Sequence, residues 1–323
     1  MPPVQDKRIL ITGGAGFIGS YLVEQLAPDN DVVVYDNLRR NAIRFSPALK
    51  HPHVRLVEAD ILDVEALRKA FRDRQIVIHC AAVAGVYSVV KSSIVTMEVN
   101  LVGTHRVLQA AVEARVERFV DFSTSEVYGP FIHKAKESDH TTIGAVGGAR
   151  WIYATSKLAA EHLTHAFVQQ HNLSAVSVRP FNVYGPRQVG EGAIRGMTLR
   201  AIAGQPIVIY NDGTQIRAWC YVEDFVDGVL RCLPTSAGVG EVFNIGNPQG
   251  TITNLELARM IKRLAGSRSE IVFEEHPGPE VELRVPSIEK AAQLLGFNPT
   301  VSLEEGITRT IAWYRDHPEA GTA

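Results

Sequence analysis

The sequence predicts an α/β protein, in which a parallel sheet with helices on both faces is joined to a smaller α/β region. An apolar strand at residues 9–12 runs directly into a glycine-rich helix start, and β-branched runs then alternate with helical patterns. Buried parallel strands have such apolar runs because helices cover both faces of their sheet. Beyond residue 187 the alternation loosens, which indicates the smaller region. The length of 323 residues allows one large or two modest domains.

Each strand is predicted from a short β-branched run, and each helix from a longer periodic pattern. After the first strand, sheet strands are expected at residues 31–35, 54–59, 75–82, 118–122, 174–179 and 241–246. Helices are expected after the glycine-rich turn, after Asp63, and at residues 96–115, 153–170 and 221–233. The smaller region is expected to carry a strand at 206–210 and helices at 191–203, 253–265, 286–295 and 302–316.

Three glycines in the turn after the first strand predict a dinucleotide site. Gly13 allows a tight turn, Gly16 lets backbone N–H groups approach a pyrophosphate, and Gly19 lets the helix pack close to the sheet. The helix N-terminus adds unpaired N–H groups for the phosphates. The fold is therefore expected to be a Rossmann-type doubly wound sheet, with its nucleotide-binding domain at residues 1–180 plus about 217–247. A substrate-binding domain is expected at about 181–216 plus 248–323.

The second strand ends in Asp36, about 20 residues beyond the glycine-rich turn, where a carboxylate can accept a hydrogen bond from a ribose 2′-hydroxyl. The same charge would repel a 2′-phosphate, so Asp36 favours NAD over NADP, although Arg39 and Arg40 follow closely and could soften that preference. The alternative is an ordinary turn residue. Ala81 and Ala82, at the end of the apolar strand 75–82, would either leave room for the cofactor or simply allow close packing.

Thr124, Tyr153 and Lys157 form the candidate catalytic group. Thr124 follows the strand at 118–122, and Tyr153 and Lys157 share one face of the next helix. An ammonium one turn away and a cationic nicotinamide both favour the phenolate form of Tyr153. That phenolate could take a proton from a sugar hydroxyl while hydride leaves the same carbon, and Thr124 would orient the hydroxyl. The alternative is a solvated helix face.

Composition excludes several other classes of protein. The formal net charge of -2 gives no sign of a nucleic-acid or membrane-binding surface. The 3 cysteines have no paired or metal-ligand spacing, so we expect reduced thiols, no metal site and a cytoplasmic protein. The strand that begins close to the N-terminus leaves no room for a signal peptide, and the longest apolar run, 76–90, is too short to span a bilayer.

These motifs together resemble the extended short-chain dehydrogenase/reductase family, and more narrowly its nucleotide-sugar epimerases, dehydratases and decarboxylases. The resemblance covers nearly the whole chain and rests on residues 12–20, Asp36, 60–61, 123–129, 153–157, 179–186 and 243–248. It implies an enzyme whose bound NAD takes hydride from sugar C4, so that a 4-keto intermediate reacts before hydride returns. It also implies a nucleotide-sugar substrate, with a UDP-sugar as the first expectation, and a homodimer formed through the helices that start near Thr96 and Tyr153.

The resemblance assigns further residues to the site. The catalytic residues implied are Thr124, Tyr153 and Lys157, joined by Ser125 and Glu126. The substrate residues implied are Asn182, Arg187, Arg217 and Arg284. The implied cofactor residues are Gly13, Gly16, Phe17, Ile18, Gly19, Asp36, Asn37, Asp60, Ile61, Ala81, Ala82, Asn100, Tyr153 and Lys157.

Glu126 bears on which reaction follows the 4-keto stage. A 4-epimerase needs no extra carboxylate, whereas a 4,6-dehydratase must remove the C5 proton and expel the C6 hydroxyl, which suits a glutamate. Thr124-Ser125-Glu126 resembles both UDP-glucuronate decarboxylases and GDP-mannose 4,6-dehydratases. Arg150-Trp151 before Tyr153 resembles the decarboxylases, and Val183-Tyr184-Gly185 is closer to epimerases. The first prediction is therefore UDP-glucuronate decarboxylation or 4-epimerisation. The alternatives are a UDP-glucose-type 4-epimerase, a 4,6-dehydratase, a 4-keto-sugar reductase and a non-catalytic NAD-binding protein; Glu126 could also merely cap a turn.

Overall fold

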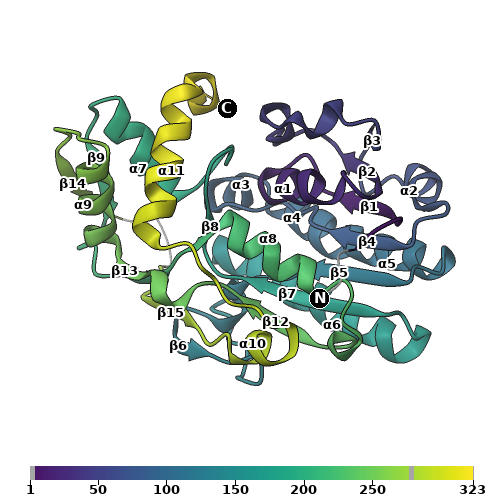
Figure 1. The fold of residues 1–323 in the computed structure, drawn as a ribbon. Coiled ribbons are helices and arrows are strands. Elements are labelled where there is room, and N and C mark those ends of the chain that lie inside the picture. Colours follow the sequence, from purple (N-terminus) through teal and green to yellow (C-terminus); the bar gives the residue numbers. More distant parts are fainter. Residues whose placement is uncertain (1–3, 276–279, 323) are drawn as a thin grey trace.

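The computed structural model describes residues 4–275 and 280–322. Its centre is a seven-stranded sheet in the order β12-β7-β5-β4-β1-β2-β3, in which every neighbouring pair is parallel (Figure 1). The strands are β1 (Arg8–Thr12), β2 (Asp31–Asp36), β3 (Val54–Glu58), β4 (Ile76–His79), β5 (Arg118–Phe122), β7 (Ala175–Pro180) and β12 (Val242–Ile245). All seven coincide with predicted strands, so the α/β class and the doubly wound parallel sheet are confirmed.

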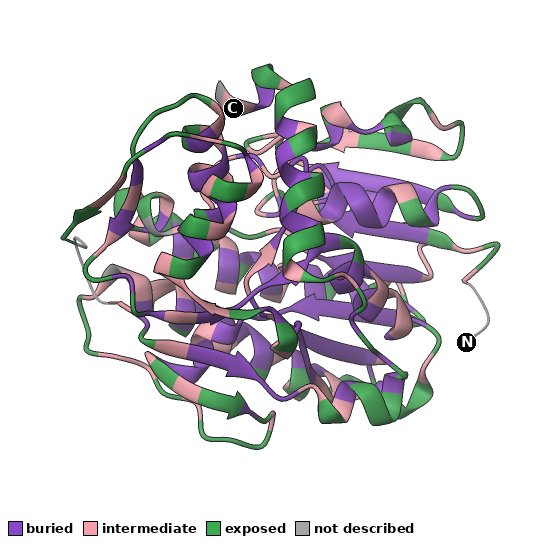
Figure 2. Cartoon of the chain, turned by 60° about the vertical axis from the view of Figure 1, so that its left-hand side comes forward, coloured by how far each residue is buried: buried purple, intermediate pink, exposed green. Residues whose placement is uncertain are grey.

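Helices cover both faces of the sheet, because successive apolar residues of each strand point in opposite directions. Ile9 and Val32 share a core with α1 (Phe17–Leu26), α8 (Val222–Arg231) and α10 (Glu289–Leu295). Leu10 and Val33 share the other core with α2 (Val64–Phe71), α5 (Thr104–Glu113) and α6 (Ala149–His171). Figure 2 shows the buried strands between helices whose outer sides are exposed.

The helix expected at 96–115 is a chain of three helical segments. α4 (Ser93–Met97) leads into a π-helical turn, η3 (Glu98–Gly103), and then into α5. In this turn the Thr104 hydroxyl donates to the backbone oxygen of Asn100, 2.7 Å away. Wider turns of this kind are frequent at functional sites. The sequence pattern did not show it, because a single widened turn barely changes helical periodicity.

The smaller region is built from short strands that the sequence analysis mostly missed. A four-stranded sheet has the order β13-β10-β15-β6, and two strand pairs, β11-β8 and β14-β9, flank it. Helices α7 (Ala193–Ile202), α9 (Asn254–Leu264) and α11 (Leu303–Asp316) pack nearby, and α3 (Val86–Lys91) follows β4. The strands are β6 (Phe131–Ala135), β8 (Val183–Tyr184), β9 (Ile207–Tyr210), β10 (Ile216–Ala218), β11 (Cys220–Tyr221), β13 (Thr251–Thr253), β14 (Ile271–Glu274) and β15 (Leu283–Pro286).

Strand β6 belongs to this second sheet although it lies inside the segment 1–180. The chain thus crosses between the two sheets more often than the predicted boundaries imply, and those boundaries stay a prediction. In residues 4–275 and 280–322, no helix is both long and apolar enough to cross a membrane. Over the same ranges no cluster of His, Cys, Asp or Glu could hold a metal ion. Cys80, Cys220 and Cys232 are free thiols.

Candidate active site

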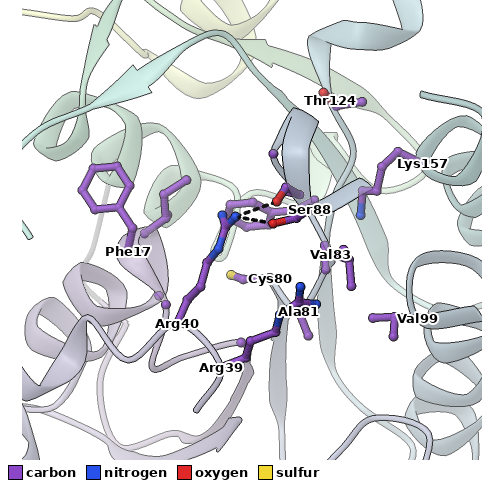
Figure 3. A pocket seen from close by; sticks show the side chains of 18 of the residues that line it. Phe17, Arg39, Arg40, Cys80, Ala81, Val83, Ser88, Val99, Thr124 and Lys157 are labelled. Carbon is purple, nitrogen blue, oxygen red and sulfur yellow. Dashed lines mark hydrogen bonds between the residues drawn. The ribbon is translucent and has the colours of Figure 1, made fainter. Parts of the chain in front are cut away.

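A cavity of about 540 Å³ opens at the carboxyl ends of β1, β2, β4 and β5. This is the edge where ligands bind in open parallel sheets. Figure 3 shows side chains of this cavity, with Phe17 on one side and Lys157 on the other. The predicted site residues that line it are Gly13, Gly16, Phe17, Ile18, Gly19, Asp36, Asn37, Asp60, Ile61, Ala81, Ala82, Thr124, Ser125, Glu126, Tyr153, Lys157 and Asn182.

The glycine-rich turn can be built only from small residues. Gly13 has a φ of +71°, and a Cβ there would lie 2.6 Å from the backbone nitrogen of Ala81. A Cβ at Gly19 would lie 2.4 Å from the backbone oxygen of Gly13, because α1 begins directly against the turn. The turn therefore leaves the start of α1 open to a phosphate-bearing ligand, as the sequence predicted.

Asp36 is fixed by backbone donors. Its Oδ2 accepts from the backbone N–H of Ala15 at 3.0 Å, and its Oδ1 accepts from that of Leu38 at 2.8 Å. Burial raises the pKa of this carboxyl, and the backbone hydrogen bonds act in the opposite direction. Each oxygen keeps a further lone pair for a ribose hydroxyl. Arg40 does not reach toward this carboxylate, because its guanidinium bonds to Ala84 and Ser88 instead.

Tyr153 and Lys157 lie one turn apart on α6, and both line the cavity. Burial raises the pKa of Tyr153 to about 12, while a hydrogen bond with Thr124 and the charge of Arg40 act to lower it. The predicted activation of the phenol by the Lys157 ammonium and a cationic nicotinamide stays a prediction. The Lys157 side chain is 1% exposed, and burial lowers its pKa.

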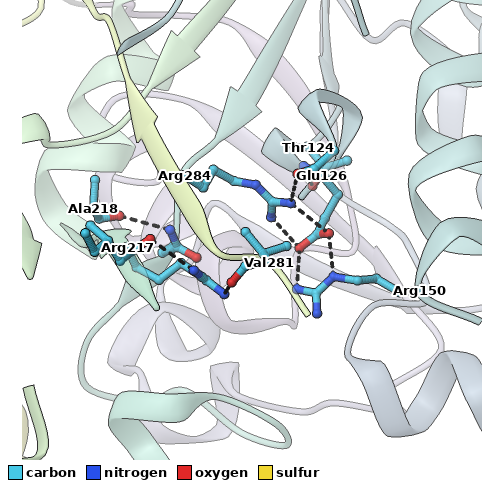
Figure 4. A network of polar contacts seen from close by, with 10 residues as sticks. Thr124, Glu126, Arg150, Arg217, Ala218, Val281 and Arg284 are labelled. Carbon is cyan, nitrogen blue, oxygen red and sulfur yellow. Dashed lines mark hydrogen bonds and ion pairs between the residues drawn. The ribbon is translucent and has the colours of Figure 1, made fainter. Parts of the chain in front are cut away.

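Glu126 is held by two arginines in a forked arrangement (Figure 4). Its oxygens accept from Arg150 at 2.9 and 3.0 Å, and from Arg284 at 2.6 and 3.2 Å. Burial opposes ionisation of Glu126, but the charges of Arg284 and Arg150 outweigh it and hold the carboxyl pKa well below its usual range. The side chain is thus a permanent carboxylate and does not cap a turn.

A third arginine, Arg217, adds positive charge next to Arg284. Arg217 is the neighbour of Arg284 across the β10–β15 pair. Burial, together with repulsion from Arg284 and Arg150, lowers the pKa of Arg217 to about 10. Its guanidinium donates to the backbone oxygens of Ile216 and Val281. Two guanidinium groups therefore bind the Glu126 carboxylate, and a third lies close enough to interact with them electrostatically.

Four predicted site residues do not line the cavity themselves: Asn100, Arg187, Arg217 and Arg284. Asn100 lies behind it and bonds to Val83 and Ser156. Arg217 lies beside Arg284 and interacts with it electrostatically, outside the set of residues that line the cavity. Arg187 lies 3.7 Å from the centre of the Tyr21 ring and pairs with Glu24 of α1. The substrate contact of Arg187 stays a prediction.

Several lining residues were missing from the predicted site. Arg40, Ser88 and Glu191 line the cavity and bond to one another across it. Glu191 had been assigned only to the start of a helix. No local pattern marks these residues, because the segments that carry them meet only in the folded chain.

Comparison with known proteins places this geometry in context. The model of the NAD dependent epimerase/dehydratase family matches residues 9–246. The chain is 35% identical to the UDP-N-acetyl-alpha-D-glucosaminuronate decarboxylase of Bacillus cytotoxicus, over 96% of this chain and 98% of that protein. It is 35% identical to UDP-glucuronic acid decarboxylase 1 of Xenopus tropicalis, over 98% of this chain and 76% of that protein.

A solved structure resembles the fold over a similar span. The UDP-glucuronic acid 4-epimerase of Bacillus cereus, in complex with UDP-glucuronic acid and NAD, superposes with a TM-score of 0.88. The two chains are 29% identical, and the match covers 95% of this chain and 99% of the epimerase.

Proposed function

This chain belongs to the NAD-dependent epimerase/dehydratase family, and from that premise we propose that it decarboxylates a UDP-hexuronate. The observation that carries the proposal is Glu126 locked between Arg150 and Arg284. Glu126 lines the cavity, and the three guanidinium groups near this one carboxylate leave an excess of positive charge there, which suits a substrate with a carboxylate at C6. The chain's likeness to decarboxylases that act on such sugars agrees with this choice.

The cavity fits NAD. The backbone packs too closely for a Cβ at Gly13 or Gly19, so the glycine-rich turn brings the start of α1 to the cavity, and Asp36 offers acceptors for a ribose. Lys157 is buried at the edge of the cavity, with an ammonium that suits ribose hydroxyls. Bound NAD would supply the reversible hydride acceptance that makes C4 a ketone and then restores it.

The protein's own residues would manage the protons and the charge. Tyr153 would take the proton of the C4 hydroxyl and return it at the end, and Thr124, which bonds to Tyr153, would hold the C4 oxygen. At the ketone stage the C5–C6 bond breaks, CO₂ leaves, and its electron pair moves to the C4 oxygen. C5 then takes up a proton. A carboxylate β to a ketone needs no further base for this step.

The state of Glu126 argues against 4,6-dehydration. Expulsion of the C6 hydroxyl needs a proton donor, and removal of the C5 proton needs a base of moderate strength. Glu126 has a pKa far below its usual range, so it holds no proton to donate and is a weak base. We therefore assign Glu126 to positioning Arg284 and Arg150.

The experiment is incubation of the purified protein with UDP-glucuronate, UDP-N-acetylglucosaminuronate and UDP-glucose, followed by mass spectrometry. The expected product of either uronate has lost about 44 mass units, while UDP-glucose is unchanged. An isomer of unchanged mass would point to 4-epimerisation, and a loss of about 18 units from UDP-glucose would point to dehydration. Either result would overturn the proposal.

We further propose that the protein is a homodimer formed through the face of α3, α4 and η3. Val90, Ile94 and Val102 on this face are 59%, 76% and 42% exposed. α3 and α4 pack against α6, so a partner here would support the helix that carries Tyr153. Light scattering should show a dimer for the wild type and a monomer for Ile94→Glu.

A cytoplasmic location is proposed from the free thiols, with cell fractionation as its test.

A further inference from the structure

A second network of polar contacts joins opposite walls of the cavity. The carboxylate of Glu191, in the loop before α7, accepts from the backbone N–H groups of Tyr87 at 2.9 Å and of Ser88 at 3.0 Å. It also accepts from the Ser88 hydroxyl at 2.8 Å. Glu191 therefore satisfies the free N–H groups of the first turn of α3, although it lies about a hundred residues away in sequence. A capping residue normally lies next to its helix.

Arg40, which follows β2, is the third member of this network. Its Nη2 donates to the backbone oxygen of Ala84 at 2.8 Å and to the Ser88 hydroxyl at 3.2 Å, and it lies 3.4 Å from Oε1 of Glu191. Figure 3 shows Arg40 crossing the cavity toward Ser88. The side chains of Arg40 and Glu191 are 34% and 27% exposed, so the pair lies at the mouth of the cavity.

Two glycines make room for this pair. A Cβ at Gly85 would lie 2.6 Å from Oε1 of Glu191, and a Cβ at Gly190 would lie 2.9 Å from Nε of Arg40. Their φ angles are +97° and +79°, which also favour glycine. The close approach of Arg40 and Glu191 is thus supported by the backbone on both sides.

The contacts join three segments that line the dinucleotide cavity. Arg40 follows the strand that ends in Asp36, Ser88 follows β4, and Glu191 comes from the loop after β8. We propose that Arg40 and Glu191 are positioning residues that close the cavity over the dinucleotide and keep it bound between the two hydride transfers. This inference rests on the proposed function, in which the hydride must return to the sugar that gave it.

Retention of the cofactor follows from the geometry. For NAD to leave past this mouth, the loop at 188–191 must separate from α3, which breaks the hydrogen bonds of Glu191 to Tyr87 and Ser88. The carboxylate makes these bonds charge-assisted, and such bonds are about twice as strong as neutral ones. The positive charge of Arg40 also faces the cavity, where a pyrophosphate carries negative charge.

The test measures the exchange of bound NAD for isotopically labelled NAD, with no sugar present. Loss of charge in Glu191→Gln should speed this exchange roughly tenfold or more. Gly190→Ala, which displaces Arg40, should have the same effect. The matched control is Glu24→Gln, because Glu24 ties the same loop to α1 through Arg187 but does not line the cavity. Its exchange rate should equal that of the wild type.

An unchanged exchange rate in both Glu191→Gln and Gly190→Ala, in proteins that melt near the wild-type temperature, would overturn the inference. So would an equal acceleration in Glu24→Gln, since any loosening of the loop would then suffice. In turnover, Glu191→Gln should lose activity over time and regain it on addition of NAD. Because the exchange assay needs no sugar, its outcome is independent of whether the wild type turns over UDP-hexuronates.

Discussion

At the scale of single residues, charge decides what each side chain can do. Glu126 and Tyr153 both lie near Thr124, yet their pKa values are shifted in ways that fit different roles. Arginines keep Glu126 ionised, whereas burial keeps Tyr153 protonated. The first is suited to holding cations in place and the second to exchanging a proton once a cationic nicotinamide lies beside it.

Replacing Glu126 should damage both activity and stability. Glu126→Gln removes the charge that balances Arg150 and Arg284, so these guanidinium groups lose their positions and decarboxylation should fall at least about hundredfold. Breaking the buried pairs should cost about 3 kcal/mol or more of unfolding free energy. Steady-state kinetics and urea denaturation measure the two effects. Glu113→Gln, which breaks an exposed ion pair with Arg68, is the control and should change little.

The stability difference between wild type and Glu126→Gln should depend on pH in a defined direction. The folded pKa of Glu126 lies below that of the unfolded chain, which is about 4.3. Its stabilisation is therefore complete above about pH 5 and is lost as pH falls through the unfolded value toward the folded one. Urea denaturation of both proteins at several pH values should show the difference shrinking below pH 5 or so. A difference that stays constant down to about pH 3 would contradict the assignment.

Tyr153→Phe should remove the proton exchange at C4 and lower turnover by about a hundredfold to ten-thousandfold, with NAD binding retained. Tyr87→Phe is the control, because the Tyr87 hydroxyl bonds to Tyr210 at an exposed position. Turnover is measured by product mass, and NAD binding by absorbance of the purified protein. Full turnover by Tyr153→Phe would show that another group serves as the base.

At the scale of elements, the π-helical turn η3 carries a fully buried polar side chain, Asn100, behind the cavity. Asn100 bonds in both directions to the backbone of Val83 and donates to the Ser156 hydroxyl. It thereby ties the segment after β4 to α6, which carries Tyr153 and Lys157. The side-chain amide of Asn100 thus links two walls of the cavity by hydrogen bonds.

Asn100→Ala should therefore weaken NAD binding without touching NAD directly. The substitution leaves the backbone groups of Val83 unpaired, which should cost about 1–3 kcal/mol of unfolding free energy. Isothermal titration calorimetry should show a lower affinity for NAD than in the wild type. The control is Asn172→Ala at the end of α6, which is exposed and far along the helix from the cavity. If Asn100→Ala binds NAD as tightly as the wild type, Asn100 supports the core and has no effect on the cofactor site.

At the scale of the whole molecule, the sheet domain and the loops that cross its edge form one binding unit. Because NAD would bind the folded chain and not the unfolded one, NAD at about a hundredfold excess over Kd should stabilise it by about 2.7 kcal/mol. Gly19→Val should abolish this effect, since a side chain there meets the backbone of Gly13. Gly196→Ala, where a Cβ meets nothing within 4 Å, is the control. Thermal denaturation with and without NAD measures the shift.

Local patterns in the sequence determined the parallel sheet, the glycine-rich turn, Asp36, and the group of Thr124, Tyr153 and Lys157. These features could be predicted because each depends on residues close together in the chain: an apolar run, a helical turn, a strand end. Parallel strands then bring their ends to one edge by topology alone.

Only the tertiary structure decided the partners of Glu126, the contact between Arg40 and Glu191, and the place of Arg187 on Tyr21. Each depends on contacts between segments distant in sequence, such as β15 against the turn at 125–128 or the loop before α7 against α3. The short strands of the smaller sheet were missed for the same reason, because their hydrogen bonds to distant strands, and not their own residues, make them strands.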